Sequence, residues 1–308
     1  MHFSGWIIGA ALAAGVGVSS SGVDNHDGYR KQIETLRQAR VARLTAPKGW
    51  LTLVGLDWLK DGRNTVGSAA DNAIVIAKAP AHLGTISLTD GKATIALDAN
   101  ADATIDGAKK ASAELLDDSH ETPTTVAFAS VSFYLVERNG QFGLRVKDGD
   151  AATRKNFLGL DYFDIDPSWR IEAKWETYDP PHEVEEPNIL GKMDKVVVPG
   201  AAVFTRDGKS YRLEPVVETP GDKNLFLVFA DKTSGKETYG AARFIYTDPP
   251  KDGKVVIDFN TAYNPPCAFT PYATCPLPTS QNRLAVRVTA GEKKYRGGHE
   301  EPSSPGKS

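Results

Sequence analysis

The chain has 308 residues, of which 41% are hydrophobic and 24% are charged, and its formal net charge at pH 7 is −3. This composition is typical of a globular protein that can bury a core, and the length fits two domains or one large β domain. A nearly balanced charge provides no positive field for nucleic acid or for an anionic membrane, so we expect no nucleic-acid partner.

Residues 1–21 differ in composition from the rest of the chain. Residues 6–18 are apolar and rich in Ala and Gly, and three serines follow at 19–21. This pattern is typical of a secretory signal peptide and is too short for a spanning helix. No Lys or Arg precedes the apolar run and no clean Ala-x-Ala site follows it, so a short apolar tail is the alternative. We therefore predict a periplasmic or secreted protein without a stable membrane span, or a cytoplasmic one if this leader is not a signal.

The segment of residues 22–47 contains the one clear helix pattern, from Asp27 to Leu44. Asp27 is a candidate N-cap, and apolar side chains recur at near-helical spacing on one stripe. Basic residues decorate the remaining surface, which indicates a solvated helix packed on a β domain; a membrane-binding basic helix is the alternative. The stripe comprises Tyr29, Ile33, Leu36 and Leu44, and the basic residues are Arg30, Lys31, Arg37, Arg40 and Arg43.

From Trp50 onward the hydrophobic period changes to two, and the expected strands are short. The dipeptides Asp90-Gly91 and Asn139-Gly140 are hairpin-turn signals between alternating segments. Short strands with turns every 8–12 residues or so indicate an all-β protein rather than a βαβ fold. We predict a small antiparallel β-sandwich at 48–150, a junction at 151–168, a larger antiparallel sheet or barrel at 169–295, and a disordered tail at 296–308.

Three segments of the second part have distinct patterns. Residues 169–175 alternate strictly between apolar and charged side chains, which predicts a half-buried strand. Residues 225–230 are apolar throughout, which predicts a central strand buried on both faces. Residues 179–191 contain three prolines and several acids, so we expect a loop there in which Glu185 and Glu186 are solvated.

The segment 258–276 contains both cysteines, together with prolines and aromatic residues. A solvated linker would be rich in Ser, Lys and Glu, so this composition indicates an ordered loop. Three interpretations of Cys267 and Cys275 stay open. They form a structural disulfide, which export favours; they are two buried free thiols; or one acts as a nucleophile or a metal ligand, for which the spacing gives weak support.

Polar residues follow the buried strand and border the cysteine loop, and we expect residues 231–243 and 258–275 to meet on one rim. Arg243 with Asp258 would form a buried pair or an anion site beside an acid. The alternative is that these groups satisfy the backbone of a loop whose prolines donate no N–H. The candidate catalytic residues are Asp231, Glu237, Arg243 and Asp258, and the candidate ligand-binding residues are Tyr239, Asn260, Tyr263 and Asn264.

The sequence contains no P-loop, H-E-x-x-H, G-x-S-x-G or dinucleotide glycine motif. We therefore predict no cofactor or metal, and we favour a non-catalytic envelope protein that binds a small ligand or a partner chain at the rim. The alternative is a hydrolase in which Asp231, Glu237 or Asp258 is the acid–base group and Arg243 stabilises negative charge. A third possibility is a structural module in which the loop is a clamp.

Four segments, at 49–56, 162–178, 233–240 and 258–278, together resemble a bacterial family described only as domain of unknown function 1684. The most specific similarity is the sequence Asn-Pro-Pro-Cys-Ala-Phe at 264–269 and Ala-Thr-Cys-Pro at 273–276. The resemblance covers almost the whole chain after the leader. It implies no activity, because the family has none assigned.

A second resemblance covers residues 59–107. The segments 62–68 and 71–76 are similar to the early strands of forkhead-associated β-sandwiches, which bind phosphothreonine peptides. The glycine-arginine of that family is Gly67-Ser68 here, and its serine-x-x-histidine stretch is replaced by residues 78–82. The resemblance thus implies the sandwich shape, while the missing phosphate-binding Arg and Ser argue against phosphopeptide binding.

Overall fold

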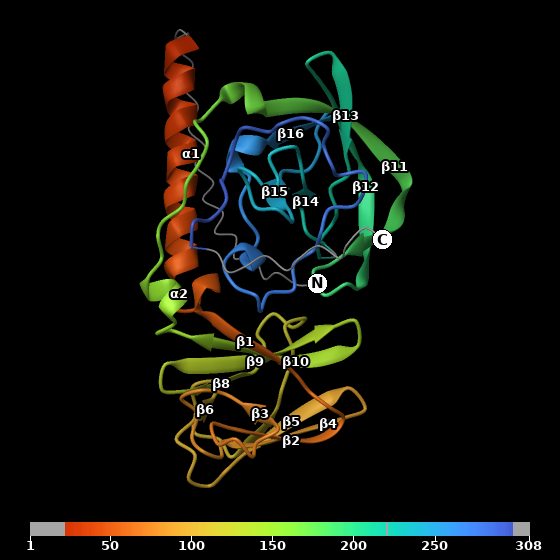
Figure 1. The fold of residues 1–308 in the computed structure, drawn as a ribbon. Helices are drawn as coiled ribbons and strands as arrows, with labels where there is room; N and C mark the ends of the chain where they lie inside the picture. The colour runs from red at the N-terminus through yellow and green to blue at the C-terminus, as the bar shows by residue number, and fades with distance from the viewer. Residues whose placement is uncertain (1–21, 220, 298–308) are drawn as a thin grey trace, which may run out of the picture.

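The computed structural model describes residues 22–219 and 221–297, and it shows a mostly antiparallel β protein with one long N-terminal helix (Figure 1). The predicted signal at 1–21 and residues 298–308 of the predicted tail lie outside the described residues. The helical elements are α1 (Gly22–Thr45), α2 (Ala152–Lys155), η1 (Trp50–Thr52), η2 (Pro167–Trp169), η3 (Phe259–Thr261) and η4 (Pro266–Ala268). The strands of the first part are β1 (Leu53–Trp58), β2 (Gly62–Gly67), β3 (Ile74–Val75), β4 (Gly84–Thr89), β5 (Lys92–Leu97), β6 (Thr104–Ile105), β7 (Ser112–Glu114), β8 (Thr125–Phe128), β9 (Val131–Arg138) and β10 (Gln141–Asp148). The strands of the second part are β11 (Arg170–Pro187), β12 (Met193–Arg206), β13 (Lys209–Leu213), β14 (Leu225–Phe229), β15 (Arg243–Thr247) and β16 (Lys254–Asp258).

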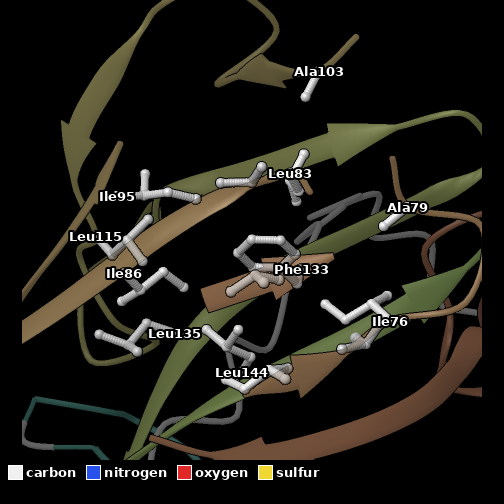
Figure 2. Packing of buried hydrophobic residues seen from close by; sticks show 14 of the residues in the cluster. Ile76, Ala79, Leu83, Ile86, Ile95, Ala103, Leu115, Phe133, Leu135 and Leu144 are labelled. Carbon is white, nitrogen blue, oxygen red and sulfur yellow. The ribbon is translucent and has the colours of Figure 1, made fainter. Parts of the chain in front are cut away.

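Strands β1 to β10 form the predicted sandwich. One sheet has the order β1-β10-β9-β8-β6 and the other the order β3-β2-β4-β5-β7. Apolar side chains of both sheets, among them Ile86, Ile95, Phe133 and Leu144, fill the space between them (Figure 2). The resemblance to forkhead-associated domains stays a prediction.

The turn between β9 and β10 shows why the local sequence selects a tight hairpin. Asn139 and Gly140 have φ of 52° and 77°, the left-handed conformation that both central residues of a type I′ turn require. Asn and Gly adopt this conformation at low cost. The turn places the outward-facing residues of β9 and β10 in register, so that Arg145 pairs with Tyr134.

The second part consists of a four-stranded sheet, β13-β12-β11-β16, and the two-stranded pair β14-β15. Figure 1 shows β14 and β15 near the centre of this part, with β16 above them and β11 to β13 along one side. All five residues of β14 are buried, as predicted for a central strand. The predicted alternation at 169–175 is also confirmed, because Trp169, Ala173 and Trp175 are buried.

The predicted loop at 179–191 is wrong, because β11 continues to Pro187. Pro180 and Pro181 lie where the pairing between β11 and β12 shifts its register, between Thr177 and His182. Since proline donates no ladder hydrogen bond, such an interruption is where a strand accommodates it. After the shift the ladder resumes, and Glu186 pairs with Asp194 instead of lying in solvent.

The predicted N-terminal helix is present as α1, but two details of the prediction are wrong. Helix α1 begins at Gly22, so Asp27 lies inside it and is not its N-cap. Ile33 and Leu44 are buried as predicted, whereas Leu36 is 44% exposed. The contact face instead includes arginine side chains, because the surface against which α1 packs is rich in carbonyls and carboxylates.

Candidate functional site

Cys267 and Cys275 form a disulfide with a Cα–Cα distance of 6.3 Å, and the described residues contain no free cysteine. Both sulfurs are buried in a cluster with apolar side chains of β14 and β15. The disulfide interpretation is therefore confirmed, and the interpretations with a free thiol, a nucleophile or a metal ligand are wrong. Within the described residues, His, Cys, Asp and Glu form no group that could hold a metal ion.

The cysteine loop is ordered and packs against the sandwich. The Thr274 hydroxyl accepts hydrogen bonds from Arg138 Nε at 3.2 Å and from Arg145 Nη2 at 3.1 Å. Arg138 in turn forms a bidentate pair with Asp118, at 2.9 and 2.6 Å. Charged side chains of β9 and β10, which the predicted rim did not include, therefore contact this loop.

Asp231 and Arg243 are the two predicted catalytic residues that the structure brings together. Arg243 Nη2 lies 3.2 Å from Asp231 Oδ1, and both side chains are fully buried. Arg243 also donates to the carbonyls of Val288 and Ala290, and Asp231 accepts from Val288 N at 2.6 Å. The pair thus fastens the C-terminal segment to β15. Burial lowers the pKa of Arg243, and Asp231 opposes this effect.

One prediction paired Arg243 with Asp258, and this pairing is wrong. The buried partner of Arg243 is Asp231. Both oxygens of Asp258 accept the Tyr29 hydroxyl of α1 at 2.9 Å, and Asp258 caps η3 through Asn260 N. Asp258 therefore joins the helix to the end of β16. Burial, with the Asp258 charge, raises the pKa of Tyr29.

The remaining predicted site residues are distributed over several contacts. Glu237 accepts from Arg287 Nη2 at 2.5 Å on the exposed surface. Tyr239 OH donates to the carbonyl of Cys267 at 3.2 Å. Asn260 Nδ2 donates to the carbonyl of Asp166 at 2.8 Å. The structure therefore does not gather the eight predicted residues around one ligand-sized space, and their functional roles stay predictions.

Asn264 belongs to a buried network that the sequence analysis did not identify. Its backbone N–H donates to Glu292 Oε2 at 2.8 Å, and Arg40 Nε lies 3.0 Å from Glu292 Oε1. Arg40 Nη2 also donates to the Asn264 carbonyl at 2.7 Å, and its guanidinium lies 4.7 Å from the centre of the Tyr263 ring. The Arg40 side chain is therefore only 12% exposed, although its charge predicted a solvated one. The signal for it is the helical spacing of Ile33, Arg40 and Leu44, which places Arg40 on the buried face.

A second polar group lies beside this network, and we call it the carboxylate–tyrosine cluster: Glu186, Glu218, Tyr246 and Tyr263. Tyr246 OH donates to Glu218 Oε2 at 2.6 Å. The rings of Tyr246 and Tyr263 are nearly parallel, at an angle of 15° and a centroid distance of 6.4 Å. The Tyr246 ring also lies 4.8 Å from that of Phe226. Aromatic faces and carboxyl groups are thus combined at one end of the inner strand pair.

The environment of the two carboxyl groups of this cluster disfavours negative charge. Glu186 is only 3% exposed and lies near the like charges of Asp194 and Glu218. Glu218 Oε1 is buried without a hydrogen-bond partner. Burial, with the charges of Asp194 and Glu218, raises the pKa of Glu186 to about 8. Burial also raises the pKa of Glu218, to about 7.

These shifts make the cluster the best candidate for a functional site, because strongly perturbed carboxyl groups concentrate at such sites. Glu186 is not among the predicted site residues, because the neighbouring prolines indicated a loop. Glu218 and Tyr246 are not among them either, because neither lies in a recognisable motif. The even spacing of Val184 and Glu186 in one strand is the signal that would have placed Glu186 on the inner face.

Two cavities of about 420 and 200 Å³ occur elsewhere, in the sandwich. The larger is an open depression over β4, β5 and β7, lined mainly by small polar side chains such as Thr85, Ser87 and Ser112. The smaller includes His120 and Asp117. Neither contains a residue that we predicted for the site. Among the described residues, the helices are all too short or too polar to cross a bilayer.

Comparison with known proteins gives a family but no activity. The solution structure of the uncharacterized protein from gene locus rrnAC0354 of Haloarcula marismortui is 33% identical, over 46% of this chain and 78% of that chain, with a TM-score of 0.39. No curated protein matches the sequence. Residues 155–293 match the model of a family described as "Protein of unknown function (DUF1684)", and through this segment the chain belongs to that family.

Proposed function

We propose that the protein is a non-catalytic binding protein whose ligand is a small organic amine or ammonium ion with an apolar body. The proposed site is the carboxylate–tyrosine cluster, which shares Tyr263 with the rim predicted from the sequence. The observation that carries the proposal is Glu186, a carboxyl group that is 3% exposed and lies near two further carboxyl groups, those of Asp194 and Glu218.

Burying an unpaired carboxyl group costs free energy, and the cost falls when a cation pairs with it. In the ligand-free protein the raised pKa of Glu186 and Glu218 keeps both groups protonated during part of the physiological range. An ammonium group would replace these protons and compensate the carboxylates. The cluster therefore favours a cationic ligand over a neutral or an anionic one.

The aromatic side chains support the same class of ligand. Cations bind over the faces of tyrosine rings, and apolar groups pack against them. Tyr246 is 41% exposed, so the cluster opens to solvent on its side. Tyr263 and Phe226 extend it inward toward the apolar cluster around the disulfide. An amine with an aromatic or short alkyl body matches this arrangement.

The hydrolase alternative has less support. A general base must reach the proton that it removes, and an anion-stabilising group needs free donors. The Asp231 carboxylate already accepts five hydrogen bonds, from Thr233, Arg243 and Val288. Two nitrogens of Arg243 donate to main-chain carbonyls. Both residues are better suited to holding the C-terminal segment than to turnover.

We also propose that the protein is exported. The disulfide supports this location, because disulfides persist in oxidising compartments and are rare in the cytosol. The segment that would direct export, residues 1–21, remains a sequence-based prediction. A fusion of residues 1–30 to a reporter that is active only outside the cytoplasm tests it: activity supports export, and an inactive cytoplasmic fusion contradicts it.

Calorimetric titration with benzyltrimethylammonium and phenethylamine tests the binding proposal. Phenethyl alcohol and phenylpropanoate serve as the neutral and the anionic analogues. The amines should bind in a saturable manner, and Glu186→Gln should weaken them at least tenfold. The matched control is Glu183→Gln, on the same strand but 62% exposed and paired with Lys195, which should leave affinity unchanged. Equal binding of neutral and cationic compounds, or no binding of either amine, contradicts the proposal.

A further inference from the structure

A separate group of residues lies on the outer face of the sandwich sheet, and we call it the basic–aromatic cluster: Trp50, Tyr134, Arg145 and Lys147. Arg145 pairs with Tyr134 across β9 and β10, and Lys147 lies two residues further along β10 on the same face. This face is opposite the apolar core, to which the intervening residues Leu144 and Val146 belong. The cluster is therefore a second, polar surface of the same two strands.

The two cations of the cluster share the same two rings. Lys147 Nζ lies 5.5 Å from the ring centre of Trp50 and 5.5 Å from that of Tyr134. Arg145 Cζ lies 5.5 and 5.9 Å from these centres. Two like charges on one pair of rings repel each other, and the ring faces compensate only a part of this repulsion.

Negative charge in the neighbourhood does not balance these cations. The nearby carboxylate is Asp118, which Arg138 holds in a bidentate pair and which lies 3.5 Å from Arg145 Nη1. Lys147 forms no ion pair among the described residues, and its Nζ donates to the carbonyl of Lys48 at 2.9 Å. The cluster therefore carries excess positive charge.

An unsatisfied donor lies in the same place. Arg145 is 3% exposed, and its Nε is buried without a hydrogen-bond partner. Its other nitrogens are engaged near Thr274 and Asp118. The Lys147 ammonium has three N–H groups: one donates to the Lys48 carbonyl and a second faces the Tyr134 hydroxyl, so a third remains for a ligand. Burial lowers the pKa of Lys147, with smaller contributions from Arg145 and Lys48, and Tyr134 opposes this effect.

We propose that the basic–aromatic cluster is a binding site for a small oxyanion, a carboxylate or a phosphate, that accepts hydrogen bonds from Arg145 Nε and the Lys147 ammonium. An oxyanion bound there would neutralise the excess positive charge and accept a hydrogen bond from Arg145 Nε, which has no other partner. Trp50, Tyr134 and Lys147 are each partly exposed, which gives the ligand access from solvent. The site is independent of the carboxylate–tyrosine cluster and of the function proposed for it.

Titration of the full-length protein with inorganic phosphate and with benzoate, at constant ionic strength, tests this site. The reporter is the indole N–H resonance of Trp50, assigned by its loss in Trp50→Phe. One or both anions should cause a saturable shift, and Lys147→Gln should weaken that binding at least tenfold. Saturation by benzoate alone identifies a carboxylate ligand, and saturation by phosphate alone identifies a phosphate ligand.

Lys174→Gln is the matched control, because Lys174 is 72% exposed and paired with Glu176. It should leave the affinity unchanged. If both anions give only a linear, non-saturating shift, or if Lys174→Gln weakens binding as much as Lys147→Gln does, the proposed site is wrong. Arg145→Lys is the second variant: it retains the charge but removes Nε, so it should weaken binding while the protein remains folded.

Discussion

Arg40 of α1 and Glu292 near the C-terminal end of the described chain form a buried ion pair with an Nε–Oε1 distance of 3.0 Å. Glu292 is fully enclosed, and its second oxygen accepts the backbone N–H of Asn264 at the start of the cysteine loop. One carboxylate therefore connects the helix, the loop and the C-terminal segment. This junction borders the carboxylate–tyrosine cluster, because the Arg40 guanidinium lies over the Tyr263 ring.

Arg40→Met should lower the free energy of unfolding by about 3–5 kcal/mol, the cost of leaving one member of a buried ion pair alone. Urea denaturation of the variant and the wild type measures this change. Arg287→Met is the control, since the pair of Arg287 and Glu237 is exposed and should contribute less than about 1 kcal/mol. Equal losses in the two variants would show that Arg40 contributes no more than a surface charge.

Reduction of the disulfide should destabilise the protein. Cys267→Ser with Cys275→Ser removes a closed loop whose cysteines are eight positions apart, worth roughly 2–3 kcal/mol in the chain-entropy model. Thermal unfolding with and without reductant measures the effect, and thiol counting in denaturant should give no free thiol in exported material. Two free thiols before reduction would contradict the disulfide.

Thr274→Val should cost about 1–3 kcal/mol, because it removes the acceptor that Arg138 and Arg145 share and leaves buried donors unsatisfied. Thr274→Ser retains the hydroxyl group and should recover most of the loss. Urea denaturation of both variants distinguishes the hydrogen bonds from the packing of the methyl group. If Ser and Val lower the stability equally, the hydroxyl is not the important group.

Glu186→Gln should change the pH dependence of stability in a specific direction. The pKa of Glu186 is raised to about 8, so the folded protein holds a proton that the unfolded chain releases above its ordinary pKa of roughly 4.3. The wild type therefore loses stability as the pH rises between these two values. Since each pKa unit corresponds to about 1.4 kcal/mol, the variant should gain on the order of 2–4 kcal/mol relative to the wild type from pH 5 to pH 9. A pH-independent difference between the two proteins would contradict the raised pKa.

The sequence predicted those elements whose patterns are local. The continuous apolar run of β14 and the alternation of Trp169, Ala173 and Trp175 depend on neighbours a few residues away, and both predictions hold. Hairpin turns such as Asn139-Gly140 are also encoded locally. The cysteine loop was recognised as ordered from its prolines and aromatic residues, and its disulfide was the favoured alternative if the protein is exported.

Predictions that required long-range partners were less accurate. Arg40 is largely enclosed because its partner Glu292 is 252 residues later in the chain and no local pattern predicts that contact. Glu186 is buried because β11 resumes its pairing with β12 after an interruption at two prolines, and local propensity favoured a loop there. Arg243 was expected to form a buried pair, but its partner is Asp231, because the Tyr29 hydroxyl of α1 engages Asp258.

The most direct test of the central proposal is a calorimetric titration of the wild type with benzyltrimethylammonium at pH 7, in two buffers of different ionisation enthalpy. The ligand has no titratable proton, so any proton released comes from the protein. If the ammonium group replaces the protons of Glu186 and Glu218, each binding event should release about one proton or more. The affinity for the ligand should then rise from pH 6 to pH 9. Glu186→Gln should reduce both the proton release and the rise in affinity. Binding without proton release, equal in the wild type and Glu186→Gln, would contradict the assignment of the site.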